Sequence, residues 1–151
     1  MSHDNAISVL NNLIETCKDG EKGFKAAAEG LTAPDIKLRF LNYSRERAQM
    51  TSELQAEVRR LGGDPEQSGS MAGALHRGWL DIKSVATGKD DYAIVAEAER
   101  GEDVAKNAYE SALNEPLPAS AHTLVHQQAV QIRQAHDDVR SLREREKVTK
   151  Q

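Results

Sequence analysis

Four side chains of metal-binding type, Glu21, Glu46, Glu102 and His136, fall where the apolar pattern predicts the interior of a helical protein. Each lies within the apolar stripe of its segment and not on the opposite, charged face. A carboxylate at an interior position is costly unless it is paired with a cation, protonated or bound to a metal. Carboxylates and imidazoles are ligands that suit iron and manganese. The four residues are therefore a candidate site for Fe or Mn.

A dinuclear carboxylate centre needs more ligands than this set supplies. In helical bundles that hold two irons, two helices each give one Glu and the other two each give a Glu-x-x-His motif. Gln49 stands where the His after Glu46 is expected, and Arg133 stands where the Glu before His136 is expected. Each half-motif therefore lacks one ligand. A cationic side chain such as Arg133 also opposes the binding of a metal cation.

Three interpretations of these residues stay open. The first is a di-iron centre with a degenerate ligand set, and the second is a single metal site formed by all four side chains. The third is a buried polar cluster in which Arg47 or Arg133 neutralises the glutamates and sets helix register more than activity. We favour the third interpretation.

The segments around Glu21 and Glu102 resemble each other. Each glutamate follows a glycine, Gly20 or Gly101, and each is followed four residues later by a lysine. A glycine inside a helix costs about 1 kcal/mol relative to alanine. We expect the two glycines to permit a close approach between helices at this level.

Other residues with chemical potential lie outside this set. His76 and Arg77 precede Trp79, which we expect to be a core anchor, and the roles of all three stay open. His122 and His126 are one helical turn apart and suit either a surface metal ion or solvation.

Cys17 is the only cysteine of the 151 residues, which excludes an intrachain disulfide and a cysteine-rich zinc site. Because it lies on an apolar stripe, we expect it to be a small buried hydrophobe. The net charge of −4 gives no overall attraction to nucleic acid or to anionic membranes. We see neither a signal peptide nor a membrane span, and we expect a cytoplasmic protein.

The segments that carry these residues are all predicted to be helices, because their apolar residues recur with the helical period and no segment alternates as a strand does. The first helix begins after Asp4 or Asn5, and the second begins at Pro34. The predicted helices end near Leu31 and Leu61, a shorter one covers about residues 71–86, and two more run from after Asp91 to Leu113 and from near Ser120 to Leu142. The charged end from Arg143 onward is expected to fray.

Long helices predict an all-α, ferritin-like four-helix bundle with a long crossover between the second and third long helices. The short helix that carries Trp79 would pack across that crossover. We expect a single domain over residues 1–151, with an ordered core over about 4–145 and a fraying tail over 146–151.

The sequence also resembles a bacterial family of ferritin-like four-helix-bundle proteins, catalogued mainly as a domain of unknown function. The resemblance extends over about residues 4–145. It is carried by Asp19-Gly20-Glu21-Lys22-Gly23-Phe24, Glu53-Leu54-Gln55, Leu61-Gly62-Gly63, residues 69–83, Glu99-Arg100-Gly101-Glu102-Asp103, Tyr109 and Ala135-His136-Asp137.

Our leading functional hypothesis is a non-catalytic helical protein that acts through self-association or partner binding. A homodimer is the expected assembly, because symmetric pairs are the commonest oligomers. A role in stress is implied by the resemblance alone. The alternatives are a metal-dependent oxidase or peroxidase, and a protein that binds or stores Fe or Mn without turnover. We expect neither nucleic acid nor membrane as a partner.

Overall fold

The computed structural model describes residues 3–65 and 78–150, and within these ranges the chain forms α-helices and no strand. The prediction of an all-α protein is therefore confirmed. The helices are α1 (Asp4–Gly30), α2 (Pro34–Arg60), α3 (Ile82–Gly88), α4 (Asp91–Leu113) and α5 (Ala119–Lys150). In this part of the chain, no helix has the length and apolar character needed to span a membrane.

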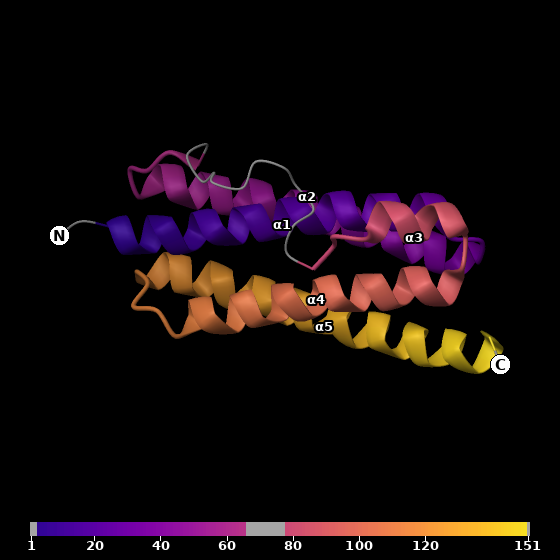
Figure 1. The fold of residues 1–151 in the computed structure, drawn as a ribbon. Helices are drawn as coiled ribbons and strands as arrows, with labels where there is room; N and C mark the ends of the chain where they lie inside the picture. Colours follow the sequence, from indigo (N-terminus) through magenta and orange to yellow (C-terminus); the bar gives the residue numbers. More distant parts are fainter. Residues whose placement is uncertain (1–2, 66–77, 151) are drawn as a thin grey trace.

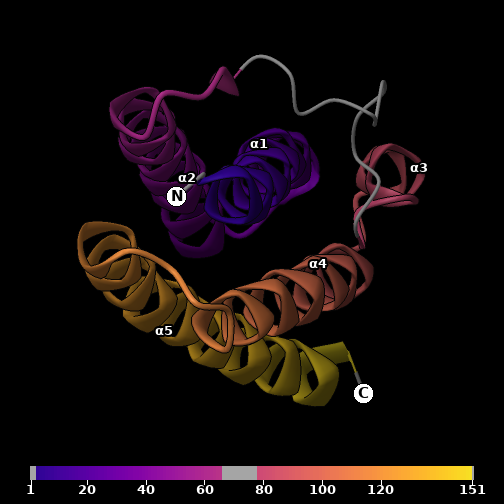
Figure 2. The same ribbon diagram turned by 90° about the vertical axis from the view of Figure 1, so that its left-hand side faces the viewer.

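The four long helices pack as two antiparallel pairs. α1 packs along α2, α4 packs along α5, and the two pairs lie against each other through α1 with α4 and α2 with α5 (Figures 1 and 2). The short α3 lies beside α1 and α4 near one end of the molecule (Figure 1). α2 ends at one end of the molecule and α4 begins near the other (Figure 1).

Local sequence explains where the long helices begin and end. Pro34 occupies the first turn of α2, where its missing N–H removes no helical hydrogen bond. After α2 the chain turns at Gly62, whose φ of 88° is a conformation that suits glycine. At the start of α4, the side chain of Asp90 accepts a hydrogen bond from the N–H of Ala93.

The short helix differs from its prediction. We expected a helix over about 71–86; residues 71–77 lie outside the described ranges, and residues 78–81 are not helical. α3 begins only at Ile82, since Gly78 has a φ of 91° and the chain turns there. Trp79 is nevertheless buried, with 1% of its surface exposed, so the prediction of a core anchor is confirmed. His76 and Arg77 lie outside the described residues.

The last helix, α5, extends to Lys150, beyond Leu142 where the apolar pattern ends. Fraying of its charged end stays a prediction. Two interhelical ion pairs hold this end: Arg143 pairs with Glu99 of α4, and Arg145 pairs with Asp35 of α2.

In the part of the chain that the structure describes, the buried apolar residues form two clusters, one toward each end of the molecule. The first contains Leu10, Leu13, Ile14, Cys17, Met50, Leu54, Val58, Ala105, Tyr109, Ala112, Ala121, Val125 and Ile132. The second contains Phe24, Ala27, Ala28, Leu31, Ile36, Phe40, Trp79, Ile82, Ile94, Val95, Ala98, Val139 and Leu142. Between them, each long helix contributes a short stretch to a middle level, and the candidate residues lie there.

Candidate functional site

The middle level lies between Cys17 and Phe24 on α1, and at corresponding positions on the other three long helices. The buried residues there include Gly20, Arg47, Glu102 and Ala135. We refer to these four residues as the central layer. Of the predicted site residues, only Glu102 belongs to this layer.

The central layer is occupied by an ion pair. Nη2 of Arg47 donates a hydrogen bond to Oε2 of Glu102 over 2.6 Å, and the exposed fractions of the two side chains are 2% and 0%. The guanidinium also lies over the ring of Phe24, 5.3 Å from its centroid. On the other side it fills the space beside Gly20, where an added Cβ would lie 2.8 Å from Nη1. The expectation that an arginine neutralises a buried glutamate is thus met by Arg47.

Electrostatics keep Arg47 charged in this setting. Burial by itself would lower the pKa of Arg47, but the carboxylate of Glu102 outweighs that effect and raises the pKa above its ordinary value. Nη1 of Arg47 and Oε1 of Glu102 have no hydrogen-bond partner among the described residues. These unpaired atoms leave the desolvation of the two charges without full compensation. Removing one partner would still be costly, because the other charge would stay buried without a counter-ion.

Glu21 and Glu46 are half-buried neighbours of the central layer and not members of it. The backbone oxygen of Glu21 accepts a hydrogen bond from the Ser44 hydroxyl, which joins α1 to α2. Glu46 lines a surface cleft of about 370 Å³ together with Tyr43 and Asp138, among others. The Tyr43 hydroxyl donates to Asp138 over 2.5 Å.

His136 is buried but engaged elsewhere. Its Nε2 lies 2.7 Å from Asp103 of α4, and its Nδ1 lies 3.3 Å from Asp137. Both aspartates are largely exposed. The pairing with Asp103 could have been suspected, since this carboxylate directly follows Glu102. Arg133, the second arginine considered for the interior, instead pairs with Glu110 at the surface.

The donor set does not fit a dinuclear carboxylate centre. Within residues 3–65 and 78–150, no three His, Cys, Asp or Glu side chains form a group that could hold a metal ion. Glu21, Glu46, Glu102 and His136 are therefore not brought together, and a cationic guanidinium lies beside the one carboxylate that is fully buried. Metal binding by the four residues stays a prediction for experiment.

A second polar network was missed by the sequence reasoning. Cys17 and the Tyr109 hydroxyl are 3.1 Å apart, and this hydroxyl donates to Gln128 over 2.7 Å. Gln128 in turn donates to the backbone of Met50 and to Glu53. The available signal was Gln128 itself, a polar residue three positions after Val125 on an apolar stripe.

The same network bears on the chemistry of Cys17. Burial raises the pKa of Cys17 to about 11, and burial also raises the pKa of Tyr109 well above its ordinary value. A thiol of this kind is protonated at neutral pH and is a poor nucleophile. The prediction of a buried, hydrophobe-like cysteine is confirmed.

The indole of Trp79 lies between two glycines of different helices. An added Cβ would lie 2.2 Å from a Trp79 ring atom at Gly23 of α1 and equally at Gly101 of α4. We expected another helix to approach closely at Gly101. The group that approaches there is instead the side chain of Trp79, which enters between α1 and α4. At Gly20, the other glycine of the repeat, the approaching group is Arg47.

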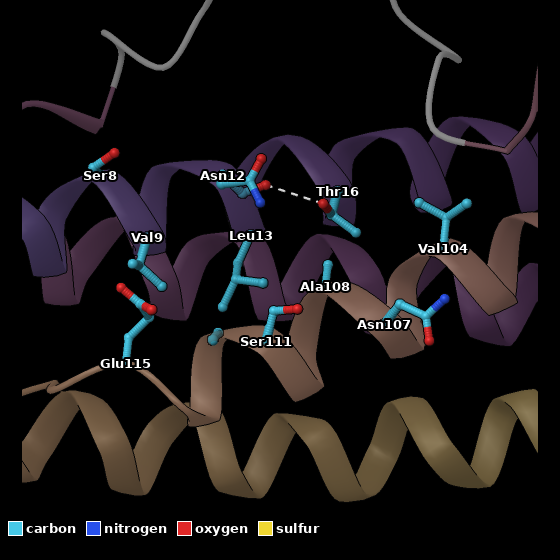
Figure 3. A pocket seen from close by; sticks show the side chains of 11 residues that line it. Ser8, Val9, Asn12, Leu13, Thr16, Val104, Asn107, Ala108, Ser111 and Glu115 are labelled. Carbon is cyan, nitrogen blue, oxygen red and sulfur yellow. Dashed lines mark hydrogen bonds between the residues drawn. The ribbon is translucent and has the colours of Figure 1, made fainter.

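Beyond Trp79, the seam between α1 and α4 continues as an open groove of about 550 Å³ (Figure 3). Its lining residues are Ser8, Val9, Asn12, Leu13, Thr16, Val104, Asn107, Ala108, Ser111, Ala112 and Glu115. Leu13 and Ala112 are buried beneath it, whereas Ser8, Asn12 and Ser111 are exposed. Of all the lining residues, only Glu115 carries a charge.

Comparison with known proteins identifies the family. A search of curated proteins finds none that matches the chain. A family model described as "Domain of unknown function (DUF2383)" matches residues 5–115, which extend from the start of α1 to just beyond α4. Arg47, Glu102 and Trp79 lie within the matched segment, whereas His136 lies outside it. The chain therefore belongs to the DUF2383 family of proteins, a domain of unknown function.

Proposed function

We propose that this protein is a ferritin-like helical bundle that acts without catalysis, through association with a second copy of itself. The ferritin-like assignment is supported by the two antiparallel helix pairs and by the placement of the end of α2 and the start of α4 near opposite ends (Figure 1). Such a placement needs the long crossover of ferritin-like bundles. A single buried thiol suits a reducing compartment, and we place the protein in the cytoplasm.

The observation that carries the non-catalytic assignment is the buried pair of Arg47 and Glu102. In a metal-binding bundle, inward carboxylates at this level would be neutralised by metal ions. Here a guanidinium supplies the positive charge, and it repels a metal cation at the same place. The pair thus serves cohesion and register of the helices more than chemistry.

Metal analysis tests this assignment. The purified protein is examined for bound metal and titrated anaerobically with Fe(II) or Mn(II), beside the variants Glu21→Ala and Glu102→Gln. We expect no bound ion whose retention depends on either glutamate. About two ions per chain, lost in these variants, would revive the di-iron interpretation. Oxygen-dependent oxidation of Fe(II) above background would then single out an enzyme.

The groove between α1 and α4 is the face that we assign to self-association (Figure 3). A chain with a net charge of −4 repels its own copies, and this repulsion is smallest across a face that carries almost no charge. Depletion of charged residues also distinguishes the cores of interfaces from other surfaces. The small side chains of Ser8, Ala108 and Ser111 let another backbone approach closely.

Sedimentation equilibrium tests the dimer. The chain mass is 16.6 kDa, so we expect a species of twice that mass at micromolar concentration. Ser111→Arg puts a charge into the groove and should yield a monomer with an unchanged circular dichroism spectrum. Ser52→Arg, at an exposed serine of α2 away from the groove, is the matched control and should stay dimeric. A monomeric wild-type protein would refute this assembly.

A further inference from the structure

Two histidines on α5 are paired in space, and their rings contact no other group among residues 3–65 and 78–150 in the interactions that the structure shows. The ring centroids of His122 and His126 lie 6.5 Å apart, and their planes are inclined by only 22°. Both residues are exposed. Residues four apart on a helix lie on one face, one turn apart, and two histidines in this arrangement can bind one metal ion together.

The backbone beneath these rings is held firmly. Ala121 and Val125, which precede His122 and His126, are fully buried. Gln128 anchors the same stretch to α2 through its hydrogen bonds to the backbone oxygen of Met50 and to Glu53. Bonds from zinc to imidazole nitrogen are about 2.0–2.1 Å long, so the rings must turn toward each other. Because both rings are exposed, this movement needs rotation of side chains alone.

The electrostatic surroundings tolerate a cation. The segment from Ala119 to Ile132 contains no Asp, Glu, Lys or Arg. Four charged residues line a surface cleft with His126: Lys106 and Glu110 of α4, and Arg133 and Asp137 of α5. Two are positive and two negative, and Glu110 pairs with Arg133. The two histidines thus face no excess of positive charge.

The remaining described histidines lack this geometry. His136 has both ring nitrogens close to aspartates and is buried. His3 is exposed, and the residue four positions later is Ile7. The pair on α5 is therefore distinct among the described histidines in offering two free imidazoles on one helical face.

We propose that His122 and His126 form a surface site for a divalent transition-metal ion of the Zn²⁺ class. Neutral imidazole suits Zn²⁺, Cu²⁺ and Ni²⁺, whereas Mn²⁺ prefers oxygen ligands. The two nitrogens leave coordination positions to water or to a carboxylate from another molecule. This site is independent of the central layer and of the groove between α1 and α4.

Calorimetric titration with Zn²⁺ in a buffer that does not bind metals tests the proposal. We expect about one ion per chain at this site. His126→Ala should lower the affinity by roughly tenfold or more, since even loss of a ligand's hydrogen-bonding neighbour costs about 10- to 100-fold. His3→Ala removes an exposed histidine without touching the pair and should leave the affinity unchanged.

A second variant tests the spacing itself. Combining His126→Ala with Gln127→His keeps the number of histidines but moves one of them to a different helical face. Its affinity should match that of His126→Ala, with an unchanged circular dichroism spectrum. Failure of the wild-type protein to bind Zn²⁺, or equal binding by wild type and His126→Ala, would overturn the proposal. Substitution of Glu102 should not affect this binding, which separates the site from the interior.

Discussion

Arg47 and Glu102 lie on α2 and α4, two helices that are diagonal to each other (Figure 2), and their side chains meet 2.6 Å apart in the interior. The pair thereby joins one antiparallel helix pair to the other across the molecule. It also separates the two apolar clusters, since it lies between Met50 and Phe40 on α2 and between Ala105 and Ala98 on α4.

Breaking this pair from one side should be strongly destabilising. Arg47→Met leaves the carboxylate of Glu102 buried without a cation, and we expect the free energy of unfolding to fall by about 3–5 kcal/mol. Adding Glu102→Leu removes the second charge and should recover most of that loss. Urea unfolding followed by circular dichroism measures both changes. A single variant as stable as the wild type would show that the pair is not desolvated as the structure has it.

The close packing of Trp79 against Gly101 predicts that alanine substitutions at two glycines differ in their effect on stability. Gly101→Ala places a methyl group against the indole, and overpacking of this kind costs about 1–3 kcal/mol. Gly88 of α3 has no atom within 4 Å of an added Cβ, so Gly88→Ala is the matched control. That control should be neutral or stabilise by up to about 1 kcal/mol, because alanine favours helix. Trp79 fluorescence during urea unfolding reports both effects. Equal changes in stability would contradict the close packing of Trp79 against Gly101.

The buried thiol predicts slow labelling of Cys17. Because burial raises its pKa to about 11, little thiolate forms at pH 8, and a disulfide reagent should react far more slowly with the folded protein than with the unfolded one. The reaction is followed by absorbance, with the protein in denaturant as the reference. Fast labelling of the folded protein would place Cys17 at an accessible position.

The raised pKa of Cys17 also predicts that the free energy of unfolding falls at alkaline pH. The pKa is about 11 when folded and near the ordinary 9.0 when unfolded, so the folded state binds the proton more tightly. Stability is unaffected by this group below pH 9 and falls between about pH 9 and 11, by at most about 1.4 kcal/mol per pH unit. Cys17→Ala should flatten part of this decline in urea unfolding, leaving the part due to Tyr109 and Tyr43, whose pKa values burial also raises. An identical decline in the variant would contradict the shift.

The hydrogen bonds of the Asp91 side chain predict that its substitution lowers the stability of the protein. Its carboxylate accepts hydrogen bonds from the N–H and hydroxyl of Thr32 and from the N–H of Ala33, which ties the turn between α1 and α2 to the start of α4. Asp91→Ala should lower the free energy of unfolding by about 1–3 kcal/mol. Asp35→Ala, which removes an exposed carboxylate in the first turn of α2 that pairs with Arg145, should have a smaller effect. Thermal unfolding of the two variants checks this difference.

Much of the architecture was predictable from local pattern. The spacing of residues such as Leu10, Leu13 and Ile14 predicted helices with one buried face, and these residues are fully buried. Pro34 marked a helix start that the structure confirms. The apolar setting of Cys17 and Trp79 likewise predicted their burial. Such features depend on neighbours within one helix, which a sequence displays directly.

Which residues form the central layer could be identified only from the tertiary structure. Successive residues on a helix are rotated by about 100°, so near the edge of an apolar stripe either of two neighbours can point inward. The packing between the helices buried Gly20 in place of Glu21 and Arg47 in place of Glu46. On α5 it buried both Ala135 and His136. It also chose Arg47 over Arg133 as the partner of Glu102. The sequence by itself determined the helices, the apolar faces and the presence of a charged interior level; only the mutual rotation of the packed helices decided which charges meet there.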